Sequence, residues 1–250
     1  MFAARQQFNY QTPAASSNWG NNMFFPLNGG QFISKSSTTA LIDWKASTGY
    51  TIEYWGYWTT FGSSINGGFG NQDGGGTNYS SFGPITGGAL EFYYWGSGTQ
   101  KVNTAASAVS LNTWTNIAAV FTSSGANTTI NLYVNGIRID IQVNGGSFAQ
   151  QQTVSNGITD TGTVFGGGKF SASILSGYLN SLRVSNINRY SGASYTLATG
   201  PFTSDSNTQL IIQPTDSAGT TISYQSTGGN GTMTNASNLV TVTTTRANHT

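Results

Sequence analysis

The chain of 250 residues contains no cysteine and a single histidine, His249, which stands next to the C-terminus. The missing thiols exclude disulfide bonds, thiolate metal sites and cysteine nucleophiles. The position of His249 argues against a Ser-His-Asp triad and against a metal site built on imidazole, because the histidine would sit on the chain's terminal tail. Carboxylates are the remaining candidates for catalysis and for metal binding.

Charged side chains are also scarce, at 7% of the chain against roughly 25% in an average globular protein. Nine basic residues nearly balance eight acidic ones, so no basic surface for nucleic acid or for an anionic membrane is expected. Solubility must rest on Ser, Thr, Asn, Gln and Gly. Low net charge promotes association, and the composition therefore favours a protein held in an assembly.

The third deficit is in long apolar runs. A membrane helix needs about 20 apolar residues, and no run of that length occurs. The N-terminal stretch MFAARQQFNYQTPAASS lacks the apolar centre of a signal peptide. We expect no membrane insertion and no export on a signal of its own, so a protein acting outside the cell would be released by lysis or carried on a particle.

The clearest pattern in the chain lies between Trp114 and Asp140. Residues 117–122 are apolar and rich in β-branched side chains, and residues 129–134 alternate between apolar and polar. Asn135-Gly136 follows, which is the strongest short hairpin signal because a type I′ turn needs positive φ at both central residues. The stretch therefore predicts three consecutive antiparallel strands joined by tight turns.

The motifs W-x-x-I-A and I-x-L-Y-V-N-G in this stretch resemble the laminin-G-like, concanavalin A-like jelly-roll superfamily. Residues 51–58 (TIEYWGYW) are similar to its early central strand, and residues 177–190 (GYLNSLRVSNINRY) to its late closing strand. The resemblance, over roughly residues 32–213, implies an all-β fold, a two-sheet antiparallel jelly-roll β-sandwich. We divide the chain into an N-terminal arm (1–19), the jelly-roll domain (20–214) and a C-terminal extension with short strands (215–250).

The strands expected at residues 50–60 and 89–95 share a pattern. In each, a carboxylate and two aromatic residues occupy every second position. If the two strands lie in one sheet, these six residues form one wide face for a ligand or an interface. The alternative is that the aromatic residues pack in the core or against another subunit. The six residues are Glu53, Trp55, Tyr57, Glu91, Tyr93 and Trp95.

The carboxylates give two further hypotheses, a glycosidase site and a calcium site. In each case the alternative is that the residues have only a structural role. A glycosidase needs two of them across the scissile bond, and Glu53 and Glu91 are the only glutamates. Retaining glycosidases of this fold resemble E-x-D-x-E, which is absent here. Members of the superfamily often bind calcium in edge loops, which makes Asp73 and Asp160 candidate ligands, although both also suit turns. We expect no cofactor other than calcium.

The resemblance to laminin-G-like modules, which are common in phage structural proteins, implies a non-enzymatic virion surface protein of a tailed bacteriophage, either a capsid decoration protein or a tail or fibre component. The uncharged polar composition and the absence of cysteine, a catalytic motif and an export signal agree with this expectation. Its partners would be other virion proteins, copies of itself and a host-surface glycan. Phe2, Phe8 and Tyr10, in a polar arm with no core of its own, are the candidate assembly residues. The alternatives are a bacterial carbohydrate-binding or adhesion module and, second, a glycosidase using Glu53 and Glu91.

Overall fold

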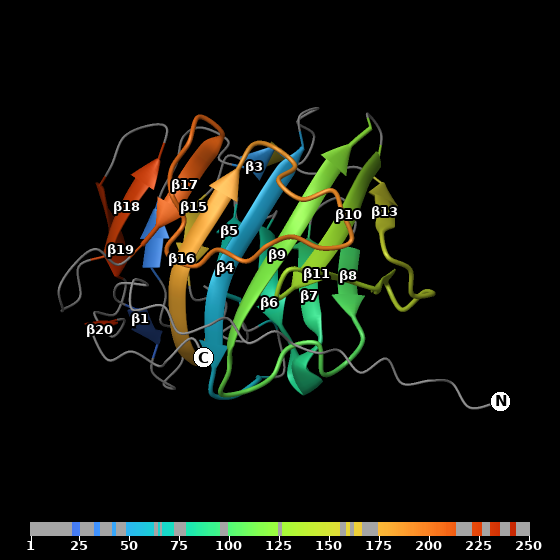
Figure 1. The fold of residues 1–250 in the computed structure, drawn as a ribbon, viewed down its shortest axis with the longest axis horizontal. Coiled ribbons are helices and arrows are strands. Elements are labelled where there is room, and N and C mark those ends of the chain that lie inside the picture. Colours follow the sequence, from blue (N-terminus) through green and yellow to red (C-terminus); the bar gives the residue numbers. More distant parts are fainter. Residues whose placement is uncertain are drawn as a thin grey trace.

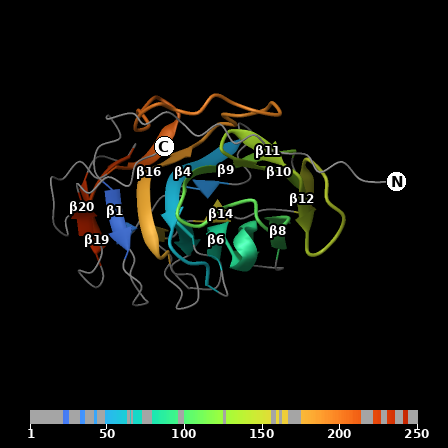
Figure 2. The ribbon, with the colours of Figure 1, turned by 60° about the horizontal axis from the view of Figure 1, so that its bottom comes forward.

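The computed structural model is a sandwich of two antiparallel sheets (Figures 1 and 2). In the part of the chain that it describes, the helical structure consists of one 3₁₀ turn, Thr86–Gly88, and no helix is long and apolar enough to cross a membrane. The described residues are 22–25, 33–35, 42–43, 49–62, 65, 67–72, 79–95, 100–124, 127–155, 159–160, 163–166, 175–213, 222–226, 231–235 and 241–243.

The first sheet faces the viewer in Figure 1 and is centred on β4 (Tyr50–Trp58), which pairs with β9 on one side and with β16 on the other. β10 and β13 continue the sheet beyond β9, and β1 and β17 pair with successive halves of β16. The further strands of this sheet are β9 (Trp114–Ser123), β10 (Asn127–Val134), β11 (Ile137–Ile139), β13 (Gln152–Ser155), β16 (Gly177–Ser185), β17 (Thr208–Ile212), β18 (Ile222–Ser226), β1 (Asn22–Phe25) and β20 (Thr241–Thr243).

The second sheet lies behind the first and contains β7 (Leu90–Trp95) between β6 and β8. Its other strands extend on both sides of these three. In order across the sheet they are β12 (Ile141–Val143), β8 (Gln100–Thr104), β7, β6 (Tyr79–Pro84), β5 (Phe69–Gln72), β15 (Thr163–Gly166), β2 (Ile33–Lys35) and β19 (Gly231–Asn235). β3 (Ile42–Asp43) and β14 (Thr159–Asp160) form a separate short ladder.

The predicted consecutive strands are confirmed in β9, β10 and β11. β10 pairs antiparallel with β9 and with β11, and Val134 lies opposite both Ile117 and Ile137. Asn135 and Gly136 form the turn with φ values of 48° and 78°, as a type I′ turn requires. The local sequence is therefore sufficient to specify this part of the first sheet.

The core lies between the sheets and takes every second residue of each strand. From β4 it receives Ile52, Tyr54 and Trp58, and from β7 it receives Leu90 and Phe92. The Tyr54 hydroxyl joins the sheets, because it donates to the Phe82 carbonyl on β6 at 2.7 Å and accepts from the Gly68 amide at 2.9 Å. Burial raises the pKa of Tyr54 well above its ordinary value, so the hydroxyl stays protonated as the donor.

The C-terminal strands close one side of the sandwich. β18 pairs with β17 in the first sheet, and β19 pairs with both β18 and β2, which belongs to the second sheet. β20 pairs with β1. These strands therefore satisfy backbone groups of their own chain that would otherwise lie unpaired at sheet edges.

One close approach between β16 and β4 tolerates only glycine. Gly177 has φ +138°, and a Cβ added there would lie 1.9 Å from the backbone oxygen of Tyr57. We expect Gly177→Ala to lower the free energy of unfolding by about 2 kcal/mol or more, measured by urea denaturation. Gly200→Ala is the control, because no atom lies within 4 Å of its added Cβ. Equal midpoints for the two variants would contradict the close approach.

Candidate functional site

The six residues predicted to form one face do not do so. β4 lies in the first sheet and β7 in the second, and in each strand the alternate residues fill the shared core. Glu53, Trp55 and Tyr57 therefore face outward from one sheet, whereas the β7 residues face outward from the other. The single wide face is wrong because the same alternation in two strands does not reveal which sheet each strand joins.

A long segment between β16 and β17 covers the outer face of the first sheet. This segment, residues 186–207, is called the strap. It crosses β4 and β9, reaches the β10–β11 turn and returns (Figures 1 and 2). The Arg138 amide donates to the Ala193 carbonyl at 2.9 Å, and the Tyr195 amide to the Gly136 carbonyl at 2.8 Å. Trp55 is fully buried beneath the strap with Phe202, so packing accounts for it.

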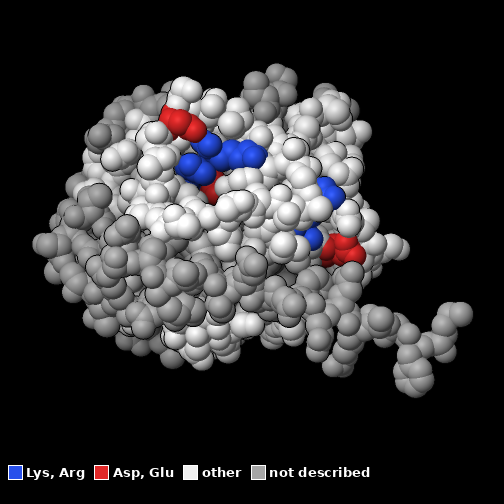
Figure 3. Space-filling model, in the orientation of Figure 1, with Lys and Arg blue, Asp and Glu red and all other residues white. Residues whose placement is uncertain are grey.

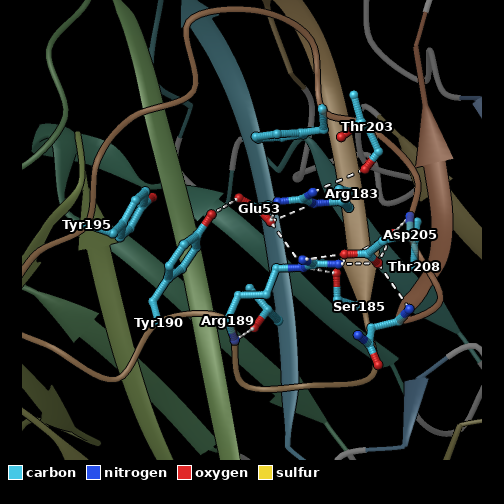
Figure 4. Close-up of polar contacts among 12 residues, drawn as sticks. Glu53, Arg183, Ser185, Arg189, Tyr190, Tyr195, Thr203, Asp205 and Thr208 are labelled. Carbon is cyan, nitrogen blue, oxygen red and sulfur yellow. Dashed lines mark hydrogen bonds and ion pairs between the residues drawn. The ribbon is translucent and has the colours of Figure 1, made fainter.

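Glu53 is fully buried at the centre of an ion network (Figure 4). Arg183 approaches Oε1 with Nε at 2.8 Å and Nη2 at 2.7 Å, and the Tyr190 hydroxyl donates to Oε2 at 2.6 Å. Burial, and then the negative charge of Glu53, raise the pKa of Tyr190. Both oxygens of Glu53 thus have strong donors, and the carboxylate holds the strap on the sheet.

The network continues to the surface through a second arginine. Arg189 makes two hydrogen bonds to the carboxylate of Asp205, at 2.9 and 2.8 Å, and its Nε lies 3.9 Å from Glu53. The hydrogen bonds from Arg189 hold the pKa of Asp205 below its usual range. Figure 3 shows these charges gathered on a face that is otherwise mostly white where it is described.

Sequence reasoning missed Arg183 as the partner of Glu53 and Asp205 as the partner of Arg189. The available signal was the scarcity of charge, since a carboxylate inside a strand of a nearly uncharged chain needs a cation to be buried. Arg189 and Tyr190 were visible only as a family-like pair after the closing strand. The interpretation of Glu53 as half of a glycosidase pair with Glu91 is wrong, because the two carboxylates lie on outer faces of different sheets.

The ion pair under the strap gives a stability prediction. Glu53→Gln leaves Arg183 without its counter-charge and should lower the free energy of unfolding by about 3 kcal/mol, measured by urea denaturation. Asp140→Asn, which removes an exposed carboxylate, is the matched control and should change stability by less than about 0.5 kcal/mol. Wild-type stability in the Gln variant would show that the ion pair does not hold the strap.

Tyr57 belongs to an aromatic row that runs across four strands of the first sheet. Phe24, Tyr178, Tyr57 and Trp114 are direct cross-strand partners in that order. Neighbouring ring centroids lie 5.0, 5.7 and 5.8 Å apart, with planes tilted by 41°, 77° and 57°. Such tilted arrangements are typical of aromatic packing, so the row stabilises the sheet.

A different aromatic group lies on the outer face of the second sheet. It consists of Tyr79 on β6 with Tyr93 and Trp95 on β7, and is called the aromatic platform. Tyr79 lies opposite Trp95, and the two rings are nearly parallel, at 12° and 6.3 Å. Tyr93 lies 5.6 Å from Tyr79 at 32°. Trp95 is 45% exposed, and Tyr79 and Tyr93 are half-buried.

Two charged residues accompany the aromatic platform. Lys101 on β8 lies opposite Tyr93, with Nζ 5.6 Å from the centroid of its ring. Glu91 precedes Tyr93 by two residues and is 8% exposed. Desolvation raises the pKa of Glu91, and the charge of Lys101 opposes the shift. Tyr79 was missed, because its contact with Trp95 arises only from the pairing of β6 with β7.

Of the remaining candidates, four lie outside the described residues. They are Asp73, Phe2, Phe8 and Tyr10. Asp160 lies in β14, opposite Ile42 of β3. Within the part of the chain that the structure describes, no three residues of the types His, Cys, Asp and Glu lie close enough to hold a metal ion. Calcium binding through Asp73 and Asp160 therefore stays a prediction.

Two antiparallel sheets with an exposed aromatic face define a lectin-like β-sandwich domain. The model of the concanavalin A-like lectin/glucanases superfamily matches residues 28–193, and the chain belongs to this superfamily. This confirms the family and the fold expected from the sequence. A comparison with curated proteins finds no match.

Solved structures share the fold at low sequence identity. A proposed carbohydrate-binding protein from Bacteroides ovatus aligns with 90% of this chain and 60% of its own, at 16% identity and a TM-score of 0.52. The heptameric SAP-like pentraxin from Limulus polyphemus aligns with 68% of this chain and 78% of its own, at 18% identity and a TM-score of 0.46. Tailspike protein 2 from an Escherichia coli O157:H7 bacteriophage aligns with 68% of this chain and 26% of its own, at 12% identity and a TM-score of 0.40.

Proposed function

We propose that this protein binds glycans through the aromatic platform of the second sheet. The observation that carries the proposal is the exposure of Trp95 beside the nearly parallel ring of Tyr79. Aromatic faces exposed to solvent take up the apolar faces of ligand rings, and polar groups beside them fix orientation. Lys101 and Glu91 supply such groups on the same face.

The platform suits a ligand better than the aromatic row of the first sheet. In that row the rings are tilted against one another, and Trp114 is only 4% exposed. The platform instead has two nearly parallel rings and an indole that protrudes from the sheet. Trp95, which is 45% exposed, therefore offers more surface to a sugar ring than Trp114 does.

The binding we propose involves no hydrolysis. Hydrolysis by paired carboxylates needs a second acid within about 10 Å of the first. Glu91 is the one carboxylate among the described residues of β6, β7 and β8. Glu53, the partner considered from the sequence, lies on the outer face of the other sheet and is held by Arg183.

Trp95→Ala tests the platform directly. We expect binding to the glycans that the protein recognises to weaken by roughly 30-fold, as for a central aromatic anchor worth about 2 kcal/mol. The measurement is isothermal titration calorimetry after a screen of a glycan array. Loss of the indole should leave thermal unfolding nearly unchanged, because the side chain is half-exposed.

Phe148→Ala is the matched control, because Phe148 is an equally exposed aromatic residue, at 48%, outside the platform. It should bind glycans as the wild-type protein does. Equal binding by the Trp95 and Phe148 variants would place the glycan elsewhere, and absence of binding across the array would reject the proposed function.

The setting we propose for this binding is the surface of a tailed-phage particle, assembled in the host cytoplasm, with other virion proteins as partners. The support is compositional: 7% charged residues, near-zero net charge, and Phe2, Phe8 and Tyr10 in a polar N-terminal segment. The alternative is a bacterial adhesion module with the same platform. The two settings differ in what the protein is attached to and not in what it binds.

Sedimentation of particles separates the two settings. We expect the full chain to co-sediment with phage particles in a density gradient, and deletion of residues 1–19 to reduce the bound fraction severalfold without lowering the unfolding temperature. The deletion removes none of the described strands, which begin at Asn22. Full-length protein that stays at the top of the gradient would contradict the virion setting and favour the bacterial module.

A further inference from the structure

Glu91 is a largely buried carboxylate on the outer face of the second sheet. The residue is 8% exposed, yet its carboxylate has no hydrogen bond and no ion pair within the described part of the chain. Glu53, the other buried glutamate, receives three donor contacts from Arg183 and Tyr190. The oxygens of Glu91 are not among the buried side-chain atoms that lack a hydrogen-bond partner, so they reach solvent and are open to donors from a ligand.

The strand places Glu91 in line with the aromatic platform. Glu91, Tyr93 and Trp95 alternate on the outer side of β7, so successive side chains start about 7 Å apart. Opposite Glu91 on β6 is Gly83, which has no side chain. On β8 the opposite residue is Asn103, whose amide nitrogen donates to the Thr104 carbonyl. A ring stacked on the platform thus meets the carboxylate at its edge.

We propose that Glu91 is the specificity-determining residue of the glycan site and accepts hydrogen bonds from hydroxyl groups of a neutral sugar stacked on Trp95 and Tyr93. This rests on the proposed function. An ionised carboxylate is an acceptor only, and an ammonium group is a donor only. Sugar hydroxyls do both, so Glu91 and Lys101 together match a hydroxyl-rich ring.

Charge favours a neutral sugar over an acidic one. The carboxylate of a uronic or sialic acid would add a second negative charge beside a partly buried first one, and like charges at this distance repel. The positive charge of Lys101 can offset only one of these two negative charges. A bound cation is the other candidate partner of Glu91, but the described strands β6, β7 and β8 carry no second carboxylate to share it.

The test compares the full-length protein with Glu91→Gln, Trp95→Ala and Asp140→Asn on neutral polysaccharides (a β-glucan, a mannan and a galactan) and acidic ones (alginate and polygalacturonate). Glu91→Gln keeps the shape but replaces a charged acceptor, so affinity for the neutral ligand should fall about tenfold or more. Burial disfavours the charged form of Glu91, so the unfolding temperature of the uncharged variant should be unchanged or higher. Asp140→Asn should leave both the affinity and the unfolding temperature unchanged.

A pH series adds a second readout. The affinity of the wild-type protein should fall as the pH drops from 7 towards 4, because the protonated carboxyl group is a weaker acceptor. Since the pKa of Glu91 is raised, the fall should begin at a higher pH than for an ordinary glutamate. In Glu91→Gln the series should be flat. The other described titratable groups on this face are Lys101, Tyr79 and Tyr93.

Three results would overturn the role of Glu91 while glycan binding stands: wild-type affinity in Glu91→Gln, a Trp95-dependent preference for the acidic polysaccharides, or binding abolished by a chelator. A lowered unfolding temperature in Glu91→Gln would mark the carboxylate as structural and would also overturn it. Absence of binding to every polysaccharide, with or without Trp95, would instead reject the proposed function itself.

Discussion

The contact between the Glu53 carboxylate and Arg183 decides which face of the sandwich is available to a ligand. With the Tyr190 hydroxyl it fixes the strap over the first sheet, where Trp55 is fully buried. The desolvation of Glu53 is offset by donors to both of its oxygens. Under the strap Trp55 has no exposed surface, whereas Trp95 on the outer side of the second sheet is 45% exposed.

Glu53 and Glu91 begin from the same local pattern and end in opposite states. The first has its donors within the fold, and the second lies on the side that carries an exposed tryptophan and no covering ion network. Polar groups without partners inside the fold are common at functional sites, where they lower stability but can bind a ligand. The contrast between the two carboxylates supports our proposal that the ligand binds on the second sheet.

The fold could be predicted from local signals, whereas the site could only be predicted in part. Asn135-Gly136 specifies its hairpin from two residues, because positive φ at both positions leaves few alternatives. The sheet that β4 or β7 joins depends on pairing with strands far away in the sequence, which alternation does not encode. For the same reason Trp95 was identified and its partner Tyr79 was not, since their contact exists only across two paired strands.

The closing of the sandwich by its last strands has a kinetic consequence. β19 pairs with β2 and β20 with β1, so residues near opposite ends of the chain become neighbours in the sheets. Such contacts raise the contact order, and loop closure over this length makes folding slow. During translation β1 and β2 leave the ribosome well before β20 and β19. One edge of each early strand therefore stays unpaired until those later strands have been made, and an unpaired edge can bind another chain.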